Sequence, residues 1–277
     1  MGYATLMVHL ELGHKNTALL AIAGDLAERL HAAVIGIAVC QPMRILYNDG
    51  YVPGEIIEQD RKEIDDEMKA AEAEFRTALS RRIAVTEWRS AVTYTSLSDQ
   101  LAKEARCADL VITGVDKNVS MFDTSRHVDI GDLVMQAGRP CLIIPAATER
   151  LALEHVVVGW KETAETRRAI RDALPLLQAA AGQVTVVEIA PEADLPAARD
   201  RVRDVTLWLK RHGVEASPVA VPSTGDDTAR LNAAMREQGA DLLIAGAYGH
   251  SRVREWALGG VTRDLLLRAE RCALVSH

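Results

Sequence analysis

The chain has 277 residues, of which 48% are hydrophobic and 26% are charged, a composition typical of a globular protein long enough for two domains. Its formal net charge is −7 and it has no lysine-rich or arginine-rich block, so we expect no nucleic-acid partner. It also lacks an uninterrupted apolar run of about eighteen residues and a basic, then apolar, N-terminus, which argues against a membrane span and a signal peptide. We therefore expect a cytoplasmic protein.

The four cysteines give no sign of a metal site or a disulfide framework. Cys40, Cys107, Cys141 and Cys272 are far apart, and none belongs to a C-x-x-C pair or to a Cys/His cluster of zinc spacing. They are expected to be free thiols in a reducing compartment.

Short apolar runs alternate with helical patterns through the first half of the chain. We predict strands at 4–10, 33–39, 83–88, 109–114 and 141–145, and helices at 15–31 and 55–79. The stretch 42–54 contains Pro, Gly and Asn-Asp-Gly and is expected to be a loop. The helix at 55–79 is highly charged but keeps one apolar stripe, which indicates a surface helix packed on a sheet.

The second half repeats the first. The run Ala108-Asp109-Leu110-Val111-Ile112-Thr113-Gly114 recurs as Ala240-Asp241-Leu242-Leu243-Ile244-Ala245-Gly246, and the final strands, beginning at Cys141 and Cys272, also correspond. These repeats lie about 130 residues apart, which is the length of a domain and too long for a solenoid repeat. We predict strands at 155–160, 183–189, 215–221, 241–246 and 272–276, a helix at 163–181, and two domains over 1–147 and 153–277.

The alternation of strands and helices defines the expected fold class. Nearly continuous apolar strands indicate a sheet covered by helices on both faces, and βαβ order indicates parallel pairing with right-handed crossovers. Each half is thus expected to be an α/β domain with a five-stranded, doubly wound parallel sheet. Ligands of such sheets bind at the carboxyl ends of the strands, at the switch point between the first and central strands.

Glycines cluster where the fourth strand of the second half ends. Gly246, Gly249 and Gly259 follow the spacing G-x-x-G-x9-G, with Gly260 next in the chain. Glycines allow main-chain N–H groups to approach an anion closely, and the helix expected near Gly260 would add free N–H donors. The spacing is neither that of a P-loop nor that of a dinucleotide-binding loop.

The duplication, the Ala-Asp-Leu strand and this glycine spacing together resemble the universal stress protein family. The resemblance covers nearly the whole chain and implies flavodoxin-like (HUP-type) domains with strand order 3-2-1-4-5 that associate through their last strands. It further implies binding of ATP or another adenine nucleotide, with or without Mg²⁺. The implied phosphate loop comprises four glycines and the backbone N–H groups of the residues that follow them: Gly246, Gly249, His250, Ser251, Gly259, Gly260, Val261 and Thr262. The resemblance also places main-chain contacts to adenine at Ile189, and Trp160 and Lys161 beside the base and ribose.

Two residues depart from the family pattern in the second half. Gly260 stands where the family has Ser or Thr, so a hydroxyl donor is lost, and Lys161 replaces the usual Asp after the first strand. Lys161 is accordingly interpreted either as a contact to phosphate or another anion, or as a solvated lysine. His250 lies in the glycine loop and is left open as a phosphate donor or an exposed residue.

The first half departs further from the pattern. Gly114 is followed by Val115-Asp116-Lys117-Asn118 without a second glycine, and Val128 and Asp129 stand opposite Gly259 and Gly260. Side chains there would hinder phosphate approach and the carboxylates would repel it. We expect this half to bind no nucleotide in the usual way, and the two halves to pack as an intrachain pseudo-dimer. Pairing of full-length chains into a homodimer is left open.

No catalytic motif stands out among the eight histidines and the other candidate nucleophiles or metal ligands. We therefore expect a stress-response protein that acts by binding a nucleotide rather than by turnover, with no catalytic residues and no resident protein-bound metal. The first alternative is an interaction or scaffold protein of the same fold that binds no nucleotide. The second is an enzyme, a slow ATPase or a nucleotidyl transferase.

Overall fold

The computed structural model describes residues 2–42, 54–115, 125–247 and 271–277. In the N-terminal half the elements are β1 (Thr5–His9), α1 (Thr17–Leu30), β2 (Ala33–Cys40), α2 (Gly54–Leu79), β3 (Thr86–Val92), α3 (Leu97–Glu104), η1 (Ala105–Cys107), β4 (Leu110–Val115), α4 (Ile130–Gln136) and β5 (Cys141–Pro145). In the C-terminal half they are β6 (His155–Trp160), α5 (Ala164–Asp172), α6 (Leu174–Ala179), β7 (Gln183–Ala190), η2 (Glu192–Asp194), α7 (Leu195–Arg211), β8 (Ala216–Pro222), α8 (Asp227–Glu237), β9 (Leu242–Gly246) and β10 (Cys272–Ser276).

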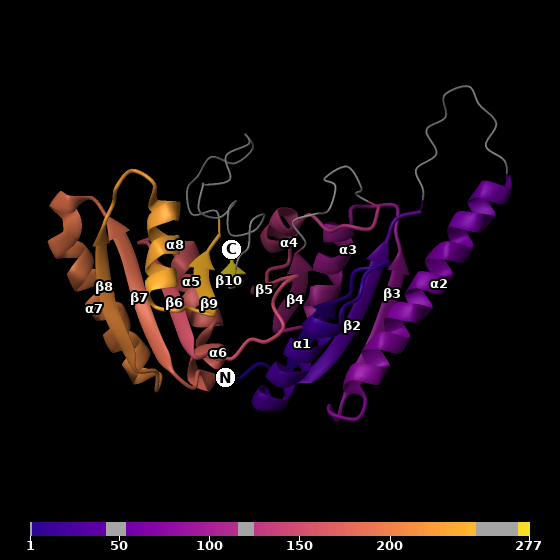
Figure 1. Ribbon diagram of the computed structural model, residues 1–277, viewed down its shortest axis with the longest axis horizontal. Coiled ribbons are helices and arrows are strands. Elements are labelled where there is room, and N and C mark those ends of the chain that lie inside the picture. Colours follow the sequence, from indigo (N-terminus) through magenta and orange to yellow (C-terminus); the bar gives the residue numbers. More distant parts are fainter. Residues whose placement is uncertain (1, 43–53, 116–124, 248–270) are drawn as a thin grey trace, which may run out of the picture.

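One sheet runs through both halves of the molecule (Figure 1). Its strand order is β3-β2-β1-β4-β5-β10-β9-β6-β7-β8, so each half has the order 3-2-1-4-5. Within each half the neighbouring strands are parallel, whereas β5 and β10 pair antiparallel with Leu142 opposite Leu274. The predicted fold class, two flavodoxin-like α/β units in tandem, is confirmed.

Helices cover both faces of the sheet. On one face, the helices α1, α2, α5, α6 and α7 contribute to a single apolar core that extends through both halves. On the other face, α3 and α4 cover the N-terminal half and α8 covers the C-terminal half in two separate cores. The halves are also joined outside the sheet, since the Tyr3 hydroxyl donates to the Asp172 carbonyl at 2.5 Å and the Arg29 guanidinium to the Ala152 carbonyl at 3.2 Å. None of the helices in the described part of the chain combines the length and apolar character needed to span a bilayer.

The aspartate of the repeated Ala-Asp-Leu run has a structural explanation at the amino edge of the sheet. The Asp109 carboxylate accepts the backbone N–H groups of Ala4 and Thr5 at 2.8 and 3.0 Å. The Asp241 carboxylate does the same for Glu154 and His155, at 2.9 and 3.3 Å. In each half this side chain therefore fastens the start of the first strand to the start of the fourth. The repeat is a folding signal on the edge opposite the predicted ligand site.

Substitution of either aspartate by alanine is expected to lower the free energy of unfolding by about 1–2 kcal/mol, because two backbone donors lose a charged acceptor. Urea denaturation followed by circular dichroism measures this change, with Asp204→Ala on the exposed face of α7 as the control. Equal midpoints for Asp109→Ala, Asp241→Ala and the control would contradict this explanation of the repeat.

Two elements differ from those expected from the sequence. The third strand begins at Thr86 rather than at 83, because Ile83 is buried after the end of α2 and the pairing with β2 begins at Thr86. The helix predicted over 163–181 is two helices, α5 and α6, that meet at Ala173. Pro175 stands in the first turn of α6, where its missing N–H costs nothing, but it could not continue the hydrogen bonding of α5.

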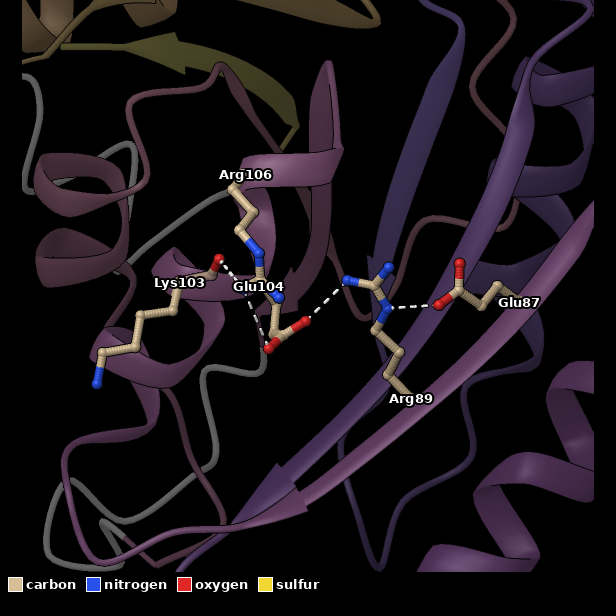
Figure 2. Close-up of polar contacts among 5 residues, drawn as sticks. All are labelled: Glu87, Arg89, Lys103, Glu104 and Arg106. Atoms are coloured by element: carbon tan, nitrogen blue, oxygen red, sulfur yellow. Dashed lines mark hydrogen bonds and ion pairs between the residues drawn. The ribbon is translucent and has the colours of Figure 1, made fainter.

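An ion-pair network ties the edge strand β3 to the end of α3 (Figure 2). The Arg89 guanidinium donates to Glu87 and Glu104, both at 2.7 Å, and Arg106 contacts the other oxygen of Glu104 at 3.4 Å. The same Arg106 nitrogen donates to the Lys103 carbonyl at 2.6 Å. Charged side chains on an edge strand oppose pairing with another sheet, so this network both anchors β3 and protects its open edge.

Candidate functional site

The candidate site lies at the carboxyl ends of β9, β6 and β7, which are adjacent in the sheet. Helix α5, which follows β6, packs on the face of the large shared core, whereas α8, which precedes β9, covers the opposite face. The strand order reverses between β6 and β9, which is where ligands of doubly wound sheets bind.

Four of the eleven predicted site residues belong to the described part of the chain: Trp160, Lys161, Ile189 and Gly246. They come together from the ends of β6, β7 and β9, as the predicted topology requires. The other seven lie outside the described residues: Gly249, His250, Ser251, Gly259, Gly260, Val261 and Thr262. The phosphate loop thus stays a prediction, and the described site residues are those at the strand ends beside it.

Trp160, the last residue of β6, carries a buried donor without an acceptor. Its side chain is 9% exposed and belongs to the large shared core. The indole Nε1 is buried and has no hydrogen-bond partner among the described residues. A buried indole N–H normally finds an acceptor, so this atom is available to a polar ligand group.

Lys161 follows Trp160 and has an exposed side chain. Its ammonium group takes part in none of the ion pairs that the described residues form, while its carbonyl accepts the Thr163 N–H at 2.7 Å. A free cation at the end of β6 fits an anionic ligand better than a base or ribose donor, because an ammonium group accepts no hydrogen bond.

Gly246 is required by helix packing. A Cβ at this position would lie 2.4 Å from the backbone nitrogen of Thr166 and 2.6 Å from the carbonyl carbon of Glu165. These backbone atoms belong to the first turn of α5, so only glycine lets the helix approach the end of β9 this closely. The first glycine of the motif therefore has a structural role, whatever it contributes to a ligand.

The N-terminus of α5, which packs on Gly246, is already capped. The Thr163 hydroxyl accepts the Thr166 N–H at 3.3 Å. A hydrogen bond from its own backbone N–H holds the pKa of the Glu165 carboxyl below its usual range, assisted by Thr163 and Arg168 against the opposing effect of burial. The Glu165 carboxylate thus stands at the helix end as an anion that a phosphate group would have to avoid.

An ion-pair network that the sequence reasoning missed supports the loop after β7. Glu188, which is opposite Trp160 in the sheet and only 6% exposed, accepts three hydrogen bonds from Arg201 of α7, at 2.6, 2.9 and 3.2 Å. The same guanidinium donates to Asp194 of η2 at 2.7 Å. The network holds the turn that follows Ile189 and thereby the main chain predicted to contact adenine. A glutamate within the apolar run of β7 was the signal that could have found it.

The corresponding edge of the N-terminal half is closed by side chains. Arg126 donates to Glu67 of α2 at 2.9 Å and to the Gln41 carbonyl at 3.0 Å, and His127 contacts Glu11. Asp129, predicted to repel phosphate, is the N-cap of α4 and accepts the Asp132 N–H at 2.9 Å. The capped helix end and the filled edge favour the expectation that this half binds no nucleotide in the usual way.

Beneath these side chains, His9 is 4% exposed at the end of β1. Its Nδ1 lies 3.1 Å from the Thr113 hydroxyl, and its buried Nε2 has no hydrogen-bond partner among the residues that the structure describes. Burial, with a smaller contribution from the charge of His127, lowers the pKa of His9 from 6.5 to about 4. His9 is therefore a neutral core histidine at pH 7. No group of three or more His, Cys, Asp or Glu residues in the described parts of the chain is arranged to hold a metal ion.

This fold, with its switch point between β6 and β9, defines a tandem protein of flavodoxin-like domains. Residues 152–276 match the model of the universal stress protein family, which confirms the resemblance expected from the sequence for the C-terminal half.

Solved structures extend the likeness to the whole chain at the level of the fold. A universal stress protein from Archaeoglobus fulgidus superposes with a TM-score of 0.75 at 14% identity, covering 98% of this chain and 95% of that one. A functionally unknown protein from Pseudomonas aeruginosa gives a TM-score of 0.62 at 12% identity, covering 99% and 92%. A universal stress protein in complex with cAMP covers 45% of this chain and 96% of that one, at 24% identity and a TM-score of 0.38. No curated protein matches the sequence significantly.

Proposed function

We propose that the C-terminal half binds ATP or a related adenine nucleotide and that the protein acts in stress response through this binding rather than through turnover. The observation that carries the proposal is that the family match covers residues 152–276, the half with the G-x-x-G-x9-G motif. The position of the crevice at the switch point between β6 and β9 agrees with it.

The base end of the proposed site is formed by the ends of β6 and β7. Trp160 Nε1 supplies a buried donor that needs an acceptor, which purine nitrogens and ribose oxygens provide. Ile189 contributes main chain held by the Glu188–Arg201 pair. Lys161 supplies the cation for the phosphates, in place of the acidic residue that the family resemblance implies.

We propose one nucleotide site per chain. The Arg126 and His127 contacts close the equivalent edge of the N-terminal half, and Asp129 already caps α4. The antiparallel pairing of β5 with β10 supports an intrachain pseudo-dimer, in which one half carries the ligand and the other serves as its structural partner. A cytoplasmic location and the absence of a catalytic residue belong to the same proposal.

One observation favours a second candidate function, an interaction protein without a nucleotide. Gly246 is fully explained by the packing of α5, and the Glu165 carboxylate lies at the same helix end. On this alternative the motif glycines serve turns and packing alone. Thermal unfolding with ligands separates the two functions.

The intact protein should be stabilised by about 2.7 kcal/mol by nucleotide at 100 times its Kd. The measurement is a thermal-shift panel with ATP, ADP, AMP and cAMP, with and without Mg²⁺, followed by calorimetry, where we expect one site per chain. Gly249→Val should abolish the shift because its side chain would block phosphate approach. Trp160→Phe should weaken binding about tenfold, the loss of one hydrogen bond to a buried donor.

Leu207→Ala on the exposed face of α7 serves as the control that leaves binding unchanged. The absence of any shift at millimolar nucleotide would favour the interaction protein instead. Release of phosphate or pyrophosphate over many turnovers would favour the enzyme.

A further inference from the structure

Residues 125–127 cross the carboxyl edge of the N-terminal half and are fastened there at three places; we call them the strap. The Ser125 carbonyl accepts the Gln41 N–H at 2.9 Å, and Arg126 donates back to the Gln41 carbonyl at 3.0 Å. Arg126 also pairs with Glu67, and His127 with Glu11. The Arg126, His127, Glu67 and Glu11 side chains are between 16% and 25% exposed, so these contacts are largely removed from water.

The strap occupies the position that corresponds to the base end of the proposed nucleotide site. In the sheet register Leu6 is opposite Leu110 and Val34, just as Val156 is opposite Leu242 and Val184. Counted from these pairs, Glu11 corresponds to Lys161, and Gln41 lies two residues beyond the counterpart of Ile189. The strap thus contacts the same two strand ends to which a base is assigned in the C-terminal half.

The strap also presents groups of the kind that a base would present. His127 places an aromatic nitrogen heterocycle on the Glu11 carboxylate, and its ring lies 5.8 Å from the ring of His14. Arg126 donates a hydrogen bond to the Gln41 carbonyl, and the Ser125 carbonyl accepts one from the Gln41 N–H. His9, whose pKa His127 influences, has a buried Nε2 with no hydrogen-bond partner in the described part of the chain.

We propose that the strap is an autoinhibitory contact: Ser125, Arg126 and His127 act as an internal ligand that keeps the N-terminal crevice closed to adenosine-like heterocycles. The correspondence with the base end rests on the proposed function of the C-terminal half, whereas the closure itself rests on the contacts of the strap alone. Release of the strap would expose a second crevice, formed by Glu11, Gln41 and His9, for uncharged nitrogen heterocycles.

The first test follows the titration of His9 by NMR of its imidazole nitrogens in the full-length protein. Among the charged groups of this edge, His127 contributes to the pKa of His9. His127 contacts Glu11, its ring lies near that of His14, and Arg126 pairs with Glu67 of α2. Glu11→Ala removes an anion, which by itself would lower the His9 midpoint. Release of the strap hydrates the ring and raises the midpoint, so the two effects have opposite signs.

We expect the His9 midpoint to rise from about 4 by at least about one pH unit in Glu11→Ala, a tenfold gain in proton affinity. The control is Glu72→Ala, which breaks an exposed pair with Arg76 on α2 and should leave the midpoint unchanged. His127→Ala is not used here, because loss of its charge would by itself raise the His9 midpoint. If Glu11→Ala does not fold, the adenosine measurement decides. A midpoint that stays at about 4 or falls in a folded Glu11→Ala protein overturns the proposal.

The second test adds millimolar adenosine, which has no phosphate for Asp129 to repel. The amide signals of Glu11 and Gln41 should shift in Arg126→Ala/His127→Ala and stay fixed in the wild type. Shifts in the wild type, or none in the double variant, overturn the proposal. The nucleotide panel tests the C-terminal site separately. Failure of the strap test would therefore not disprove nucleotide binding there, and failure of the panel would not disprove closure by the strap.

Discussion

Gly246→Ala should lower the free energy of unfolding by about 2–4 kcal/mol, while the same change at Gly114 should have almost no effect. The two glycines hold the same place in the repeated strand motif, but their surroundings differ. At Gly246 a methyl group meets backbone atoms of Thr166 and Glu165 at 2.4 and 2.6 Å, which cannot move without shifting α5. At Gly114 the first contact of a methyl group is the Ile144 carbonyl oxygen, at 3.9 Å.

Urea denaturation of the two variants, each compared with the wild type, measures this difference. Neither position has a positive φ, so backbone strain does not confuse the comparison. Equal losses at the two glycines would mean that α5 retreats easily from β9 and that its close packing is unimportant. The result also guides the ligand tests, because nucleotide affinity lost in Gly246→Ala would report on folding, whereas Gly249→Val examines the loop itself.

The second large effect is a dependence of stability on pH that arises from His9. Its pKa is about 4 in the folded protein and 6.5 in the unfolded chain, so the unfolded state binds the extra proton first. The contribution of His9 to stability is therefore complete above pH 6.5 and is lost as the pH falls toward 4. We expect a loss of about 2 kcal/mol by pH 5 and about 3 kcal/mol by pH 4 from this residue alone.

His9→Asn isolates this contribution, because asparagine can still bond to Thr113 but does not titrate. Its free energy of unfolding, measured by urea denaturation between pH 8 and pH 4.5, should fall less steeply than that of the wild type. His212→Gln, which changes a histidine at the end of α7, provides the comparison. Parallel pH profiles for wild type and His9→Asn would show that the imidazole is hydrated in the folded state.

The repeated strands were predictable because they depend on local pattern. The apolar runs, the recurrence of Ala-Asp-Leu and the crossover rules led to two five-stranded parallel units, whereas the order 3-2-1-4-5, which each half has, was implied by the family resemblance. Two element boundaries differed, because a proline and strand pairing set them and the apolar pattern does not show either effect. Pro175 divided the helix expected over 163–181, and the pairing with β2 moved the third strand to Thr86–Val92.

The candidate site was less predictable, because the role of a motif glycine or of a charged residue depends on its partners in the folded protein. Gly246 was predicted to belong to a phosphate loop, and the structure shows that the packing of α5 also requires glycine there. Glu188 and Arg201 were not predicted as site residues, although their ion pair holds the turn after Ile189. Asp129 was expected to repel phosphate and was found to cap α4. In each case the deciding partner is distant in the sequence or is a backbone group.

The sequence by itself determined the duplication, the fold of each half and the family of the second half, since these follow from periodicity, motif spacing and chain order. The pairing of β5 with β10 agrees with the association through last strands that the resemblance implied. Only the tertiary structure decided that His9 is buried and neutral, and that Arg126 and His127 fill the carboxyl edge of the N-terminal half. These properties arise from desolvation and from contacts between residues that can lie more than a hundred positions apart, which local pattern does not encode.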